Sequence, residues 1–180
     1  MYLYHYYDKR SGPFKSLTSL TEDEAFSVLE KIKLERPSSL TAKRDADYIT
    51  KRMKCERTVR KEAENKGIMM DIPSPHYLVV EHSPWLSTWF EDPGMIKIPI
   101  ERFDTRKISF TYGDSMPAFS PLVNDGKEYR KKVYTYEEIL DIIARYGLPQ
   151  TWNDDGSRGP ERYIEAQVWT DDPVKSYILK

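Results

Sequence analysis

Thiol and imidazole groups for nucleophilic or metal chemistry are few, because the chain holds one cysteine and three histidines. In the sequence, Cys55 is surrounded by Lys51, Arg52, Lys54 and Arg57. Neighbouring cations lower the pKa of a thiol and make it more reactive. No general base accompanies this thiol, so the pattern favours a small residue on the side of a helix over a catalytic nucleophile.

The closest approach to a metal-binding group is the set His76, Glu81 and His82. Successive side chains of an extended segment point to opposite faces, so Glu81 and His82 would not converge on one ion. The sequence also contains no HExxH motif and no paired CxxC motif. We therefore expect no metal site.

Basic residues gathered between positions 42 and 66 offer a surface for nucleic acid or for a protein partner. This segment holds nine Lys or Arg and five Asp or Glu. The candidate binding residues, which could follow a phosphate backbone, are Lys51, Arg52, Lys54, Arg57 and Arg60. The alternative is a solvated helix that stabilises itself through pairs four residues apart, such as Asp47 with Lys51.

A histidine, a tyrosine and a glutamate occur in that order on three predicted strands. They are His5 near the N-terminus, Tyr112 at the end of Ser-Phe-Thr-Tyr, and Glu165 in the last strand. This order resembles that of the ADP-ribosyltransferase-like fold, including its DNA-modifying toxin and RNA 2'-phosphotransferase branches. The family often has a polar or acidic residue two positions before its glutamate, and here Tyr163 stands there.

The resemblance implies an NAD-using ADP-ribosyl or 2'-phosphoryl transferase acting on a nucleic acid or a protein. His5 would hold a ribose of NAD, Tyr112 would stack on nicotinamide, and Glu165 would stabilise the ribosyl cation formed as nicotinamide leaves. A carboxylate placed beside developing positive charge suits the cleavage of a glycosidic bond. The mechanism requires His5 and Glu165 to face one cleft.

Three helices are predicted around these residues. Thr21 with Glu24, and Thr135 with Glu138, have capping-box spacing, in which side chain and backbone satisfy each other at a helix start. The first helix ends before Pro37, and the second covers about 136–146. A third, long and charged helix is expected over about 41–66, with Gly67 as its stop.

Alternation of apolar and polar residues predicts strands at 2–7, 76–80, 95–100, 107–112 and 162–170, with a short one at 133–135. Pro99 cannot donate to a ladder, which puts its strand at an edge or a bulge. The strand-rich part is about 76–135. We expect one α+β domain over residues 1–180, with a largely antiparallel twisted sheet and about three helices.

Composition excludes several classes of protein. One cysteine cannot form an internal disulfide, and no apolar run reaches the length of a membrane span. With no signal peptide in evidence, we expect a cytoplasmic protein that does not contact a membrane. Its 13 tyrosines predict an amphipathic core boundary or a binding cleft.

Two further functions stand beside the transferase. The first is non-catalytic binding of nucleic acid, nucleotide or a protein partner through the basic helix and an aromatic surface. The second is a structural or regulatory domain with no small-molecule site.

Overall fold

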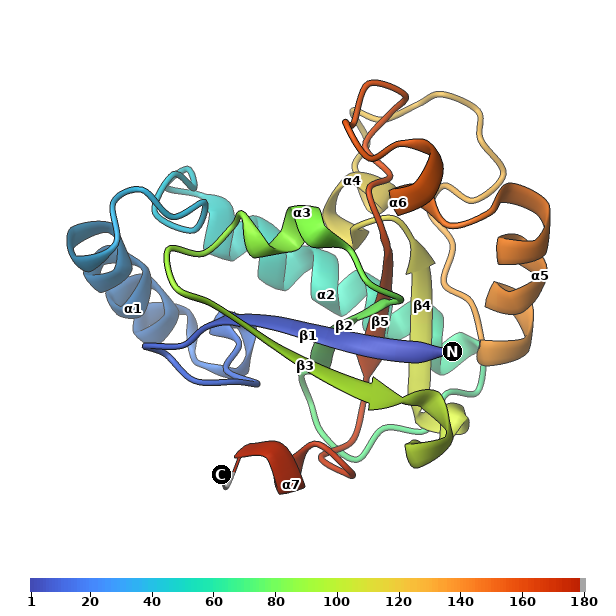
Figure 1. Cartoon of the computed structure of the whole chain (residues 1–180), viewed down its shortest axis with the longest axis horizontal. Coiled ribbons are helices and arrows are strands. Elements are labelled where there is room, and N and C mark those ends of the chain that lie inside the picture. Colours follow the sequence, from blue (N-terminus) through green and yellow to red (C-terminus); the bar gives the residue numbers. More distant parts are fainter. Residues whose placement is uncertain (179–180) are drawn as a thin grey trace.

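Five strands form one open antiparallel sheet in the order β3-β1-β2-β5-β4 (Figure 1). The strands are β1 (Tyr2–Asp8), β2 (His76–Val80), β3 (Pro93–Pro99), β4 (Ile108–Tyr112) and β5 (Ile164–Val168). The computed structural model describes residues 1–178. The expected α+β class with an antiparallel sheet is confirmed, and Pro99 lies on the edge strand β3.

The three main helices are α1 (Glu22–Glu35), α2 (Tyr48–Asn65) and α5 (Tyr136–Tyr146). Short helices are α3 (Pro84–Ser87), α4 (Ser115–Phe119), α6 (Pro149–Trp152) and α7 (Lys175–Ile178). Single 3-10 turns are η1 (Leu17–Ser19), η2 (Ile100–Arg102) and η3 (Thr105–Lys107). None of the helices within residues 1–178 is both long and apolar enough to cross a bilayer.

One face of the sheet packs on α5 and is almost wholly apolar. Its buried strand residues include Leu3, Leu78, Phe110 and Ala166, which meet Ile139 of α5 in one cluster. The register aligns Leu78 with Ala166 and Ala166 with Phe110 across three strands. Because side chains alternate along a strand, their sequence neighbours must point to the other face.

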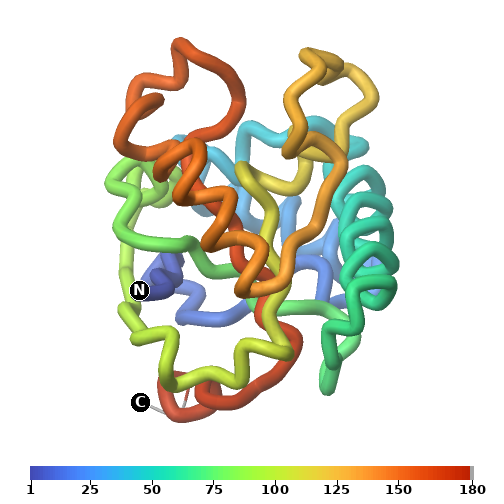
Figure 2. The backbone as a smooth tube through the Cα atoms, turned by 90° about the vertical axis from the view of Figure 1, so that its right-hand side faces the viewer, coloured from blue at the N-terminus to red at the C-terminus, as the bar shows by residue number. Residues whose placement is uncertain are grey.

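The other face of the sheet is covered mainly by α2, which Figure 1 shows behind the strands. In the view of Figure 2, α5 lies nearest the viewer and α2 runs along the right side. Val59 and Ala63 of α2 pack against Trp169, just beyond β5. Nearer β1, this face is aromatic, with Tyr4, Tyr6 and Tyr163 in one buried cluster.

The long helix expected from position 41 begins only at Tyr48. Residues 39–44 form separate turns instead, because Ser39 Oγ accepts from the Ala42 amide at 3.2 Å and Leu40 N donates to Trp89 O at 3.0 Å. The strand expected at 133–135 is a single bridge between Tyr134 and Phe110. The last strand, expected over 162–170, is paired only from Ile164 to Val168.

Both predicted capping boxes are confirmed. At the start of α5, Thr135 Oγ1 accepts from Glu138 N at 3.3 Å, and Thr135 N donates to the Glu138 carboxylate at 3.0 Å. This start fixes the helix that seals the apolar face of the sheet.

Replacing the cap by Thr135→Ala should lower the free energy of unfolding by about 1 kcal/mol, because one helix-end amide loses its acceptor. Urea unfolding followed by circular dichroism measures the change. Asp141→Ala, at an exposed position in the middle of the same helix, is the control and should stay within about 0.5 kcal/mol of the wild type. Equal effects of the two substitutions would contradict the capping role.

Candidate functional site

A row of side chains crosses the α2 face of the sheet and carries a buried carboxylate at its centre. The register aligns Tyr4 with Val79, Val79 with Glu165, and Glu165 with Thr111. Glu165 is the only ionisable residue among the five of β5, all of which are buried. The strand pairing therefore places an acid under α2, on a strand that is paired on both sides.

The Glu165 carboxylate is anchored by a buried chain of hydrogen bonds. Trp169 Nε1 donates to Ser109 Oγ at 2.9 Å, and Ser109 Oγ donates to Gln167 Oε1 at 2.8 Å. Gln167 Nε2 then donates to Glu165 Oε1 at 3.0 Å and to Thr111 Oγ1 at 3.2 Å. An ionised carboxylate can only accept, so Glu165 turns the Gln167 N–H towards itself and leaves the Gln167 carbonyl oxygen to accept from Ser109.

Arg52 of α2 lies against this carboxylate. Its guanidinium is 3.7 Å from Glu165 Oε2 and 3.6 Å from Asp114 Oδ1, and it donates to Ser115 Oγ at 2.9 Å. The Arg52 side chain is 12% exposed and that of Glu165 is 5% exposed. The guanidinium carbon also sits 4.3 Å from the centre of the Tyr77 ring. One arginine thus joins the helix, the sheet and the start of α4.

Burial changes the acid–base properties of this cluster. Burial raises the pKa of Glu165, Arg52 opposes that rise, and Asp114 adds to it. Burial works against the charge on Arg52, but Tyr77, Glu165 and Asp114 outweigh it and hold the Arg52 pKa well above its usual value. Ionisable groups with shifted pKa values that meet in a pocket mark a candidate functional site.

A pocket of about 320 Å³ opens over these groups. Arg52, Asp114 and Glu165 form its charged floor, and its aromatic walls are Tyr4, Tyr6, Tyr48, Tyr77, Trp89, Phe90 and Tyr163. Tyr163 OH donates to Asp114 Oδ2 at 3.1 Å. We call this the floor-acid pocket. Its size and its mixture of apolar walls with a few convergent polar groups are typical of small-molecule sites.

The structure does not bring His5, Tyr112 and Glu165 to one cleft. His5 follows Tyr4 in β1, and Tyr112 follows Thr111 in β4. Tyr4 and Thr111 lie in the same cross-strand row as Glu165. Strand alternation therefore points His5 and Tyr112 to the α5 side and Glu165 to the α2 side. Only Glu165 lines the floor-acid pocket.

Tyr112 is fully buried and its hydroxyl is used inside the protein. The hydroxyl donates to the carbonyl oxygens of Gly147 and Tyr146, at 2.8 and 3.2 Å, and accepts from Trp152 Nε1 at 3.3 Å. These bonds tie the end of β4 to the segment after α5. The Tyr112 side chain is therefore part of the core, and it does not offer the exposed ring on which we expected nicotinamide to stack.

His5 joins three segments of backbone. Its Nε2 accepts from Phe14 N at 2.8 Å, and its Nδ1 lies 3.0 Å from Tyr77 O. Because a backbone amide can only donate, Nε2 carries no proton and Nδ1 donates to the carbonyl. Burial lowers the pKa of His5 from 6.5 to about 4, against the raising effect of the Tyr77 carbonyl. The ring is a neutral structural link between β1, β2 and the loop after β1.

The five basic residues proposed for partner binding do not form one surface. Arg52 turns inward to the pocket floor. Lys51 pairs with Asp47 at 2.6 Å, and Arg60 pairs with Glu64 at 2.9 Å. Lys54 and Arg57 are exposed.

Cys55 and the histidines show no arrangement for metal or thiol chemistry within residues 1–178. Cys55 Sγ donates to Ser115 O at 3.4 Å, and burial raises the pKa of the thiol to about 11, in spite of nearby Arg52. In this part of the chain, no group of three or more His, Cys, Asp or Glu side chains is placed to hold a metal ion.

Comparison with known proteins adds no assignment to this geometry. No protein family, curated protein or solved structure matches the chain. The assignment of a function therefore rests on the site itself.

Several residues of the pocket were not among those selected from the sequence. Asp114, Tyr163, Tyr77 and Trp89 come from four different segments, and nothing in their spacing shows that they meet. One signal was available, because Tyr163 and Glu165 fall on the same face of a predicted strand. Arg52 was selected as a surface cation, whereas it is the buried partner of Glu165.

The role of His5 predicts a pH-dependent stability. The folded protein keeps His5 neutral, so the contribution of His5 to the free energy of unfolding is complete above pH 6.5. Between pH 6.5 and about 4, the unfolded chain takes up a proton on this ring and the folded protein does not, so the contribution is lost as the pH falls. The loss should be of the order of 3 kcal/mol. His5→Gln should remove this part of the pH dependence of the free energy of unfolding. His82→Gln, at an exposed position, is the control and should keep it.

Proposed function

We propose that the floor-acid pocket binds a nucleotide or a closely related phosphate ester. The single observation that carries this proposal is the buried Arg52–Glu165 contact at the base of an aromatic pocket. Flat aromatic walls suit a planar ring, and base–aromatic stacking is tolerant of the base.

The floor of the pocket suits groups that donate hydrogen bonds. Glu165 Oε1 accepts from Gln167, and the carboxylate also faces the Ser115 hydroxyl and, at 3.7 Å, the Arg52 guanidinium. Asp114 Oδ2 accepts from Tyr163 alone. Sugar hydroxyls or an exocyclic amine can donate to such oxygens, and a buried site built for these donors rejects ligands that lack them.

The mouth of the pocket suits an anion. Lys15 and Arg44 line it, and neither makes an ion pair with another residue of the described part of the chain. The Arg44 guanidinium carbon lies 4.6 Å from the centre of the Tyr48 ring and 5.5 Å from that of Trp89, which holds the cation over the aromatic wall. A ligand whose ring and hydroxyls lie inside the pocket and whose phosphate lies at Lys15 and Arg44 would match both the floor and the mouth of the pocket.

An NAD-using transferase is the second candidate, and one observation favours it. A carboxylate in a largely dry aromatic pocket can stabilise positive charge that develops on a ribose. Such an activity would rest on Glu165 and the pocket walls, without His5 or Tyr112. If the partner is a nucleic acid, Lys54 and Arg57 are the two candidate contact residues on α2 that are exposed and have no intrahelical ion pair described above.

A ligand panel tests the proposed function. The panel contains AMP, GMP, CMP, UMP, NAD, adenosine and a single-stranded oligonucleotide, each followed by thermal shift and calorimetry. A ligand at a hundred times its Kd should stabilise the protein by about 2.7 kcal/mol. At least one mononucleotide should bind, and more tightly than its nucleoside. No binding by any member at millimolar concentration would refute the proposal, and release of nicotinamide from NAD would identify the transferase.

Two substitutions test the two ends of the pocket. Glu165→Gln should weaken nucleotide binding about tenfold or more, since a hydrogen bond to a buried charge is worth about 1.5–3 kcal/mol. Arg44→Gln should weaken mononucleotide binding several-fold and leave nucleoside binding unchanged. Lys132→Gln, an exposed cation away from the pocket, is the control. Identical losses for nucleotide and nucleoside in Arg44→Gln would place the phosphate elsewhere.

The pH dependence of binding follows from the raised pKa of Glu165. Donor groups of the ligand need the ionised carboxylate, so affinity should fall as the pH drops through a pKa above the usual 4.5. Calorimetry of the wild type across this range should show the loss. Glu165→Gln should lose this part of the pH dependence. Nucleoside binding gives the cleaner readout, because the phosphate of a nucleotide changes its own charge at a pKa of about 6.

A further inference from the structure

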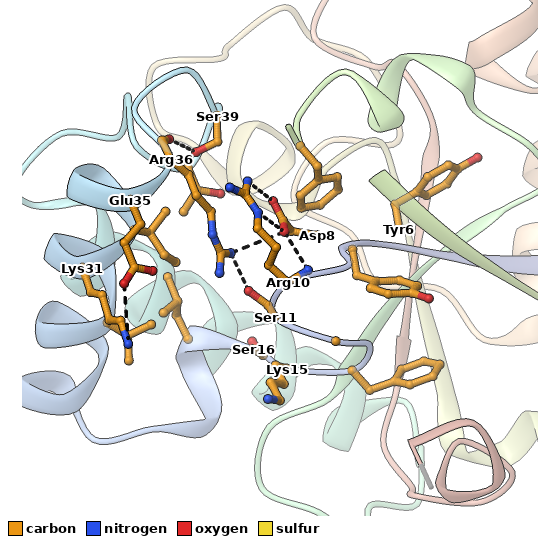
Figure 3. Close-up of a pocket in the computed structure, with 18 of the residues that line it drawn as sticks. Tyr6, Asp8, Arg10, Ser11, Lys15, Ser16, Lys31, Glu35, Arg36 and Ser39 are labelled. Carbon is orange, nitrogen blue, oxygen red and sulfur yellow. Dashed lines mark hydrogen bonds and ion pairs between the residues drawn. The ribbon is translucent and has the colours of Figure 1, made fainter. Parts of the chain in front are cut away.

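A second and larger cavity lies beside the floor-acid pocket, between α1, the end of β1 and the loop that follows it (Figure 3). Its volume is about 580 Å³. The two cavities share Lys15 and Phe90 among their lining residues, but Glu165 and Arg52 line only the smaller one. We call the larger one the α1 cavity.

One side of the α1 cavity is apolar and open. Val28 and Ile32 of α1 line it together with Leu17 and Leu20. Val28 is 38% exposed and Leu20 is 36% exposed, so this helix face leaves apolar surface in contact with water. An apolar ligand body that covered these side chains would remove that surface from water, which is the main driving force for such binding.

The other side of the α1 cavity carries a guanidinium with unused donors. Arg36 is 12% exposed, its Nη1 donates to Ser11 Oγ at 2.5 Å, and the same atom lies 3.7 Å from Asp8 Oδ1. Its Nε is buried without a hydrogen-bond partner, and its Nη2 makes no hydrogen bond to any residue from 1 to 178. Figure 3 shows this guanidinium beside Ser11 and Arg10.

Arg36 shares Asp8 with Arg10, which makes the shorter contacts to both carboxylate oxygens. Arg10 Nε and Nη2 donate to the two Asp8 oxygens at 3.1 and 3.0 Å, and the Arg10 amide donates to Oδ1 at 3.0 Å. Arg10 also pairs with Glu91 at 3.0 Å, so two carboxylates face two guanidinium groups. Lys31 pairs with Glu35 at 3.7 Å. Of the charged residues that line the cavity, Lys15 is left without an ion pair to any residue from 1 to 178, so the lining has a small excess of positive charge.

We propose that the α1 cavity binds an amphipathic organic anion, with its carboxylate at Arg36 and its apolar body along Val28, Ile32, Leu17 and Leu20. The guanidinium fork offers two parallel donors, which matches the geometry of a carboxylate. This site adjoins the proposed nucleotide site and shares Leu17 and Lys15 with it, but the proposal does not rest on nucleotide binding.

Octanoate is the probe that tests the proposal. Octanol is a control with the same hydrocarbon chain and no charge, and acetate is a control with the carboxylate and no long chain. Calorimetry should give saturable binding of octanoate, at least tenfold tighter than binding of octanol or acetate. Amide shifts in nuclear magnetic resonance should change at Val28 and Ile32. Equal affinities for octanoate and octanol would overturn the role of the carboxylate. Equal affinities for octanoate and acetate would overturn the role of the apolar side chains. Absence of octanoate binding would overturn the whole proposal.

Substitutions on α1 locate the site. Val28→Asp should weaken octanoate binding at least tenfold, whereas Leu34→Asp, on the same helix at a position 84% exposed and outside the cavity, should leave it unchanged. Arg36→Gln should remove the preference for octanoate over octanol, with circular dichroism confirming the fold. Glu165→Gln should not alter octanoate binding. Unchanged binding in Val28→Asp would place octanoate elsewhere and refute the assignment.

Discussion

The contact between Arg52 and Glu165 holds together the part of the molecule on which the proposed nucleotide site depends. Glu165 lies on β5, between β2 and β4, where burial penalises its charge. A cation from another element offsets this penalty, and α2 supplies it. The same guanidinium reaches Asp114 and Ser115, so α4 is positioned by the same group. Buried ion pairs add little net stability. The placement of this pair at the floor of a pocket is consistent with the proposed ligand site.

Strand alternation decides which residues can cooperate. In β1, it sends Leu3 and His5 to the apolar face sealed by α5, and Tyr4 and Tyr6 to the face that carries the floor-acid pocket. The same rule separates Tyr112 from Glu165 across one pair of strands. The two faces therefore have different roles: one supplies a continuous core, and the other combines packing with the buried polar chain and the pocket.

Local patterns in the sequence predict the elements well, but they predict the site only in part. Capping pairs such as Thr135 with Glu138, and the period-two strands, depend on residues a few positions apart. The floor-acid pocket depends on Arg52, Asp114 and Glu165, which the β2-β5-β4 pairing and the docking of α2 bring together. The inward turn of Arg52 is decided by that docking. The order His, Tyr, Glu contains no information about which face each side chain takes.

The direction of the hydrogen bonds that start at Trp169 has a consequence for proton exchange. Gln167 holds Glu165 Oε1 with an amide N–H, and an amide does not pass a proton on. The Thr111 hydroxyl points its own proton away, to Gly113 O at 2.9 Å. On the Gln167 side the carboxyl is therefore a dead end for protons. Exchange must take the opposite side, through the Ser115 hydroxyl or the pocket. A ligand seated over that side would slow the exchange of the Glu165 proton with solvent.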